Sequence, residues 1–128
     1  MTTIKALLIP YDESVPVEEF EFDDGKFTTI DDKVLGGNIK GSYLGISTFR
    51  NKNTILMYDD TGLLTQPNNT NTRAMKLWAH LAGMNLDNFR QPLVGNYVVS
   101  GLTDWGDSAD VTSDVRYFFG EEGVRQGD

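Results

Sequence analysis

The sequence contains no cysteine and only one histidine, and both shortages limit its chemistry. Without cysteine there is no disulfide, no thiolate metal ligand and no thiol nucleophile. With His80 alone, a metal site built on two imidazoles is excluded, and a Ser-His-Asp triad would depend wholly on this residue. The sequence also has no nucleophile elbow, phosphate loop or dinucleotide fingerprint. We therefore predict that the protein is not an enzyme, with no catalytic residues, no metal site and no cofactor.

A long apolar run is missing as well. The apolar residues that follow Lys5 number only five, which is too few for a signal-peptide core or a membrane span. Together with the absence of cysteine, this predicts a cytoplasmic protein that does not bind membranes.

The composition is that of a folded protein. The chain has 128 residues, of which 39% are hydrophobic and 23% are charged, enough to bury a core without disulfides. No linker, repeat or low-complexity tract divides it. We expect a single globular domain over residues 1–120, followed by a flexible C-terminal tail over residues 121–128.

The net charge of −8 is unevenly distributed. Residues 11–32 carry a net charge of −8, residues 33–103 carry +4, and residues 104–128 carry −5. The acidic balance argues against direct binding of nucleic acid, which depends on lysine and arginine contacts to phosphate. The basic middle segment leaves room for a small anionic ligand.

Hydrophobic patterning predicts an α+β fold. An apolar run stopped by Pro10 indicates a buried strand, and the alternation around Phe20 and Phe22 indicates its hairpin partner. Ala74, Leu77, Trp78 and Leu81 form the apolar stripe of a helix that ends at Gly83. Further elements are predicted as a helix over 27–35, one or two strands within 39–49, strands over 53–58 and 92–102, and a helix capped by Thr112 or Ser113. The expected architecture is a single domain with a mixed or mostly antiparallel sheet of about five strands, the first strand and 92–102 at its centre, and two or three short helices.

The start of the helix at residues 68–78 is the strongest candidate for a binding site. Unpaired N–H groups at a helix start favour anions, and a cation there is locally unfavourable unless an anion compensates it. Arg73 and Lys76 lie three residues apart on one side of this helix. Arg73 therefore meets either a carboxylate of residues 11–32 or 104–110, or an anion from outside. The candidate ligand-binding residues are Thr70, Asn71, Thr72, Arg73, Lys76 and Trp105, with Thr70 or Asn71 as the helix cap.

The acidic loop 103–110 contains Trp105 between aspartates. An exposed tryptophan is a stacking platform for a base or an anchor at a protein interface, although Trp105 could equally fold back over the sheet. Asp104, Asp107 and Asp110 do not follow the alternating ligand spacing of a calcium loop, so we interpret them as turn-forming residues.

Several short motifs together resemble a known family. They are the opening strand Ile4-Lys5-Ala6-Leu7-Leu8-Ile9-Pro10, a Gly36-Gly37 turn, Asn71-x-Arg73-Ala74, Gly95-x-Tyr97-Val98-Val99-x-Gly101 and Thr103-Asp104-x-Gly106-Asp107-Ser108-x-Asp110-Val111. Their order resembles a family of small domains of unknown function found in tailed phages, actinobacteria and mobile elements. Asn96 stands where that family usually has aspartate, so no ionic role is assigned to it. The resemblance implies a phage-encoded accessory protein that acts in the host cytosol and is not part of the virion.

Two functional hypotheses follow. The first is a non-enzymatic counter-defence protein that sequesters a small nucleotide-like immune signal, with Arg73 and Lys76 on phosphate, an aromatic residue on the base, and a homo-oligomer enclosing the ligand. The second is an acidic decoy in which residues 11–32 and 104–128 mimic DNA or dock on a basic host defence protein. A structural or regulatory adaptor would need neither feature.

Overall fold

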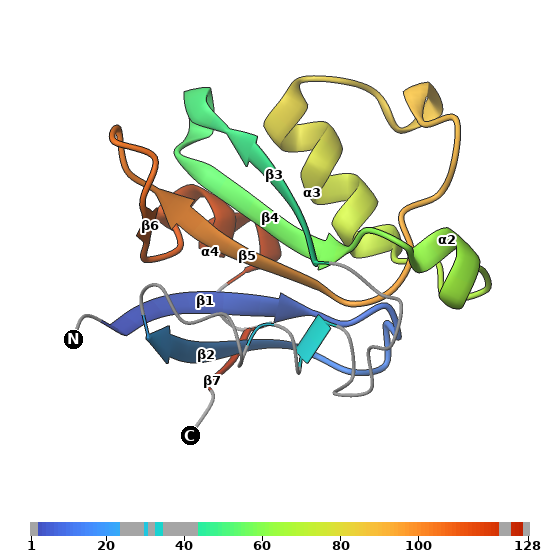
Figure 1. Cartoon of the computed structure of the whole chain (residues 1–128), viewed down its shortest axis with the longest axis horizontal. Helices are drawn as coiled ribbons and strands as arrows, with labels where there is room; N and C mark the ends of the chain where they lie inside the picture. The colour runs from blue at the N-terminus through green and yellow to red at the C-terminus, as the bar shows by residue number, and fades with distance from the viewer. Residues whose placement is uncertain (1–2, 24–29, 31–32, 35–43, 121–123, 127–128) are drawn as a thin grey trace.

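The computed structural model describes residues 3–23, 30, 33–34, 44–120 and 124–126, which form an α+β domain around one sheet (Figure 1). The strands are β1 (Thr3–Ile9), β2 (Val17–Asp23), β3 (Leu44–Phe49), β4 (Thr54–Asp59), β5 (Tyr97–Leu102), β6 (Ser108–Ala109) and β7 (Val124–Gln126). The helices are α2 (Gly62–Thr65), α3 (Thr72–Ala82) and α4 (Ser113–Phe119), with 3-10 turns η1 (Arg50–Lys52) and η2 (Leu86–Asn88). The predicted fold class is confirmed.

The sheet has the order β3-β4-β5-β1-β2-β7, and β6 extends β5 as a short extra pairing. The pairing of β2 with β7 is parallel and the other pairings are antiparallel. The predicted hairpin is confirmed, because β1 and β2 pair with Ala6 opposite Phe20. The predicted central position of the late strand is also confirmed, since β5 lies between β1 and β4 and all six of its residues are buried.

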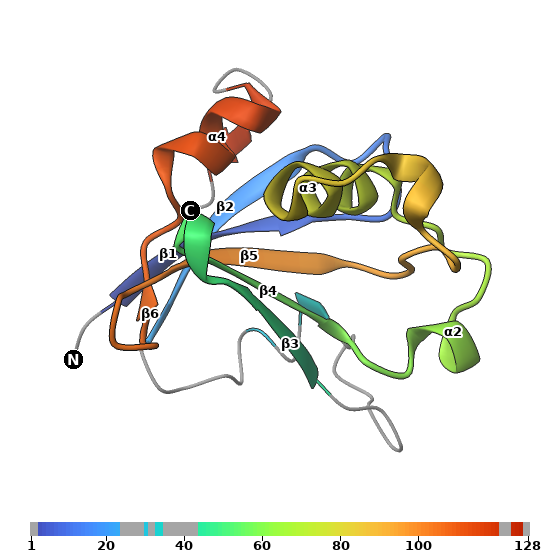
Figure 2. The same cartoon turned by 90° about the horizontal axis from the view of Figure 1, so that it is seen from above.

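The sheet carries a hydrophobic core on each face. On one face, α3 and α4 pack over a cluster that includes Leu7, Leu56 and Val99 (Figure 2). On the other face, Ile30 and Val34 pack against residues such as Phe22 and Met57. Burial on both faces explains why β1 and β5 have nearly continuous apolar sequences.

Helix α3 forms as its sequence predicts. The Asn71 side chain accepts a hydrogen bond from the Ala74 N–H and so caps the first turn. Gly83 ends the helix with a φ of 66°, a left-handed conformation that glycine adopts without strain. Trp78 packs against the edge of the core, with its ring 5.1 Å from that of Phe49.

Three predicted boundaries differ from the structure. The strand predicted over 92–102 begins only at Tyr97, because Gly95 has a φ of 81° that interrupts an extended chain. A single-turn helix, α2, begins at Gly62, where the sequence predicts no element. Strand β7 lies within 121–128, for which the sequence predicts a tail. Its backbone pairs with β2, which would otherwise be an edge strand with unpaired main-chain groups.

The remaining predicted elements are confirmed in part. The cap of α4 is Thr112, whose Oγ1 accepts a hydrogen bond from the Val115 N–H. Of the helix predicted over 27–35, residues 30 and 33–34 are helical and the others lie outside the described residues. The predicted strand region 39–49 is β3 from residue 44 onward, and residues 39–43 also lie outside the described part of the chain.

Candidate functional site

Asn71 is fully buried at the start of α3 and connects three parts of the fold. Its Oδ1 accepts the Ala74 N–H at 2.9 Å, while its Nδ2 donates to the carbonyl oxygens of Ile9 and Gly95, both at 2.9 Å. These bonds tie the helix start to the end of β1 and to the approach to β5. Asn71 is therefore the predicted cap, and its side chain is committed within the fold.

Arg73 binds the loop between β1 and β2. Its Nη2 donates to the main-chain carbonyl oxygens of Pro10, Asp12 and Val15 at 2.6, 2.9 and 2.8 Å. Desolvation lowers the pKa of Arg73, and the nearby carboxylates of Glu13 and Asp12 oppose this shift. The positive charge at the start of α3 is thus compensated by main-chain carbonyl oxygens of the same protein. Two carboxylates at longer range add to this effect.

The same loop occupies the space in front of the Arg73 guanidinium. Carbonyl oxygens are the negative ends of peptide dipoles, so this arrangement disfavours a phosphate at Nη2. Within the described residues, the Arg73 Nε is buried and has no hydrogen-bond partner.

The other predicted residues of the helix start have separate environments. Thr70 is exposed and forms an isolated antiparallel bridge with Val94. Thr72 is half-buried in the first turn, and Lys76 is exposed one turn further along. None of these residues lines either of the two pockets described below.

Trp105 is 90% exposed at the tip of a hydrogen-bonded turn after β5. The Gly106 N–H donates to the Thr103 carbonyl at 3.0 Å, and the Asp107 N–H donates to the Thr103 Oγ1 at 3.0 Å. Gly106 has a φ of 88°, which favours glycine at this position. The turn therefore presents Trp105 to solvent between two exposed aspartates, Asp104 and Asp107.

The structure does not bring Trp105 to the start of α3. Ile9, at the end of β1, pairs with Tyr97, at the start of β5, and Asn71 bonds to Ile9, so the helix start lies beside the beginning of β5. The segment between β5 and β6, which contains Trp105, follows the opposite end of that strand (Figure 1). A single ligand the size of a nucleotide cannot contact both.

A pocket of about 420 Å³ lies beneath the Trp105 turn. Asp104, Trp105 and Asp110 are among its lining residues, and Asp110 also accepts the Lys5 main-chain N–H at 2.8 Å. In the part of the chain that the structure describes, no group of three or more histidine, cysteine, aspartate or glutamate side chains is placed to hold a metal ion.

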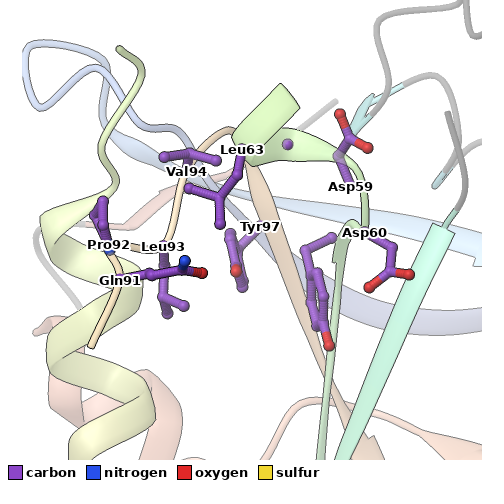
Figure 3. A pocket seen from close by; sticks show the side chains of 10 residues that line it. Asp59, Asp60, Leu63, Gln91, Pro92, Leu93, Val94 and Tyr97 are labelled. Carbon is purple, nitrogen blue, oxygen red and sulfur yellow. The ribbon is translucent and has the colours of Figure 1, made fainter. Parts of the chain in front are cut away.

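A second pocket, of about 220 Å³, lies at the other end of β5 (Figure 3). We call it the tyrosine pocket. Tyr58 and Tyr97 form its aromatic wall, with ring centroids 5.0 Å apart and planes inclined by 18°. Its other lining residues come from the end of β4, from α2 and from the chain before β5, and they include Asp59, Asp60, Leu63 and Gln91.

The polar groups of the tyrosine pocket differ in their burial and in their hydrogen bonds. Asp59 is 7% exposed and accepts the Thr61 N–H and hydroxyl, at 2.9 and 2.7 Å, and the Gln66 Nε2 at 3.2 Å. Asp60, by contrast, is exposed. Burial raises the pKa of the Tyr97 phenol well above its usual range, and Tyr58 and the two carboxylates raise it further. Tyr97 therefore stays neutral at physiological pH.

The tyrosine pocket could not be found from the sequence. Its residues come from separate segments, 58–63 and 91–97, which meet because β4 pairs with β5. The one local signal was Asp59-Asp60 at the end of a strand, and that pair also suits an ordinary turn.

Comparison of the chain with known protein families, with curated proteins and with solved structures finds no match. No helix among the described residues is long and apolar enough to cross a membrane.

Proposed function

We propose that this protein is a non-enzymatic binding protein that docks on a basic protein. The observation that carries the proposal is the charge of the two pockets described above, which are formed by described residues. Asp59 and Asp60 border the tyrosine pocket, Asp104 and Asp110 border the other, and no described lysine or arginine lines either of them. Concave surfaces of one charge sign attract the opposite charge, so both pockets favour a cationic group and disfavour phosphate.

Two arginines are bound within the fold and are not open to a partner. Arg73 is bound by three carbonyl groups, and Arg116 on α4 pairs with Glu19 on β2. These positive charges are consumed within the fold, whereas Asp60, Asp104 and Asp107 are exposed. Lys5, Arg50, Lys52, Lys76 and Arg90 are exposed as well, so the acidic character that favours a basic partner is local to the two pockets and the Trp105 turn.

The Trp105 turn supplies an anchor for such an interface. Tryptophan is enriched among the residues that carry most of the binding energy of protein interfaces. Its two aspartate neighbours favour a partner with an apolar cavity rimmed by basic residues. The resemblance to phage-associated domains suggests that this partner belongs to the defence system of a host cell.

The proposal is tested by affinity capture from bacterial lysate at about 50 mM and about 500 mM salt. We expect basic proteins that are retained at low salt, released at high salt and lost with the variant Asp104→Asn/Trp105→Ala/Asp107→Asn. Asp87→Asn, at an exposed aspartate of η2 outside both pockets, is the matched control. Identical captured sets for wild type and the triple variant would contradict the proposal. Release of the partner by duplex DNA would identify the protein as a DNA mimic.

Sequestration of a nucleotide-like signal stays a prediction from the sequence and the resemblance. Calorimetry with cyclic oligonucleotides and cyclic ADP-ribose derivatives tests it, with Arg73→Ala as the decisive variant. Native mass spectrometry tests the predicted homo-oligomer in the same samples.

A further inference from the structure

We infer that the tyrosine pocket is a recognition site for a single arginine side chain of the basic partner. The inference rests on the proposed function, because it names the group that the acidic surface receives. It is carried by the juxtaposition of a phenol hydroxyl that opens into the pocket without a hydrogen-bond partner, an aromatic wall and an exposed carboxylate in one small pocket.

The hydroxyl of Tyr97 gives the pocket a hydrogen-bonding group. Tyr97 is 3% exposed and its hydroxyl forms no hydrogen bond with another described residue, yet the oxygen is not among the buried atoms without a partner, so it opens into the pocket. A buried tyrosine hydroxyl usually has a partner, since leaving it unpaired costs free energy. In Figure 3 Tyr97 lies at the centre of the pocket lining, and the Gln91 side chain extends toward it. A ligand that donates N–H groups here satisfies an oxygen atom that the fold leaves unpaired.

The aromatic wall of the pocket favours a planar cation. Tyr58 stacks on Tyr97, and a hydrogen bond of 2.7 Å between the Tyr58 and Ser47 hydroxyls holds its ring in place. A guanidinium is planar and stacks on aromatic faces, where the negative face of the ring attracts its charge. The rigid wall thus favours arginine over lysine, whose ammonium group is compact and strongly hydrated.

The charge and the size of the pocket also favour an arginine side chain. Asp60 is an exposed lining residue of the pocket, and hydrogen bonds hold the buried Asp59 carboxylate in a fixed position beside it. Both favour a cation, and a planar donor fork matches a carboxylate better than a point charge does. The volume of about 220 Å³ is below the roughly 300–1,000 Å³ of pockets that enclose whole small molecules, so one long side chain suits it.

The test uses three short capped peptides that are identical except for one residue, which is arginine, lysine or citrulline. Citrulline keeps the shape of arginine but carries no charge. In NMR titrations of the ¹⁵N-labelled protein, we expect the arginine peptide to shift amides of residues 58–63 and 91–97, and to bind about tenfold more tightly than the citrulline peptide.

Two conservative variants locate the site. Tyr97→Phe removes only the hydroxyl and keeps the stacked wall, and Asp60→Asn removes only the charge. Each should weaken binding of the arginine peptide by about three- to tenfold, with Asp87→Asn unchanged, and spectral dispersion and the unfolding temperature confirm that each variant folds. Equal binding of the arginine and citrulline peptides, shifts confined to the Trp105 turn, or unchanged binding by both variants would overturn the inference. Tighter binding of free arginine than of the peptide would also overturn it, because the pocket would then be a small-molecule site.

The experiments distinguish a failure of the docking function from a failure of the arginine site. If the arginine peptide does not bind but the lysate partner is captured and depends on Trp105, the docking function stands and the arginine site is refuted. If the peptide binds as expected but no salt-sensitive partner is captured, the arginine site stands and the docking function is refuted.

Discussion

Replacing Arg73 by methionine keeps the apolar stem of the side chain and removes its guanidinium. The three hydrogen bonds from Nη2 to the loop between β1 and β2 are then lost. The hydrogen bond to the Pro10 oxygen is partly buried and its donor is charged, so it is worth about 1.5–3 kcal/mol. The Asp12 and Val15 oxygens are at the exposed edge, where water replaces the lost donor and each loss costs only about 0.5 kcal/mol.

One contribution to the free energy of unfolding favours the variant. Removing a cation from the first turn of a helix recovers about 0.3–1 kcal/mol. The net decrease in the free energy of unfolding for Arg73→Met is therefore about 2 kcal/mol, which for a chain of this size lowers the unfolding temperature by about 8 °C. Arg73→Lys should lie between wild type and Arg73→Met, because lysine retains the charge but not the planar donor group.

Urea denaturation followed by circular dichroism measures the free energy, and amide hydrogen exchange reports the loop. We expect faster exchange at Val15, whose N–H donates to the Asp12 carbonyl at 3.0 Å. Lys76→Met, at an exposed position on the same helix, should change the free energy by less than about 0.5 kcal/mol. If Arg73→Met were as stable as Lys76→Met while the protein lost affinity for an anion, Arg73 would be a ligand-binding residue and the reasoning here would be refuted.

Three further perturbations test the fold around the pockets. Asn71→Ala removes a helix cap and leaves two buried carbonyl groups unpaired, so urea denaturation should show a loss of about 3 kcal/mol, against less than about 1 kcal/mol for Asn69→Ala. Burial raises the pKa of Tyr97 above its value in the unfolded chain. The ionisation of Tyr97 should therefore leave the free energy of unfolding unaffected below about pH 10 and decrease it as the pH rises above that value. In Tyr97→Phe the loss of stability above about pH 10 should be smaller. An unchanged pH profile in this variant would show that other groups cause the loss. Gly101→Ala should destabilise the protein by about 2 kcal/mol or more in the same assay, since a Cβ there would lie 2.1 Å from the Asp110 carbonyl oxygen; wild-type stability would contradict this packing.

The elements that the sequence predicted well are those whose signals are local. The apolar run before Pro10 indicates β1, and the stripe of Ala74, Leu77 and Leu81 indicates α3, because a strand or a helix must bury one face wherever it packs. The cap at Asn71 follows from a short polar side chain before that stripe.

The environment of Arg73 could not be predicted in the same way. Its hydrogen-bond partners are main-chain carbonyls 58 to 63 residues away, and every residue has such a carbonyl whatever its side chain. Sequence reasoning about a compensating charge therefore considers only carboxylates and external anions. The loop between β1 and β2, whose carbonyl oxygens accept the hydrogen bonds, has no sequence pattern that indicates this role. The exposure of Trp105 is similarly a property of the turn conformation, although Gly106 and its aspartate neighbours do predict the turn itself.

Strand β5 fixes the distance between the two contact points proposed for the partner. Tyr97 is its first residue, the Trp105 turn follows its last, and six residues of extended chain span about 20 Å. Pairing with β1 and β4 on both sides makes this separation rigid. A partner that presents an arginine and an apolar cavity at that spacing gains the second contact at high effective concentration once the first has formed, so two weak contacts combine into strong binding. A partner with the same two features at another spacing can use only one of them, and the length of a buried strand thereby selects among partners.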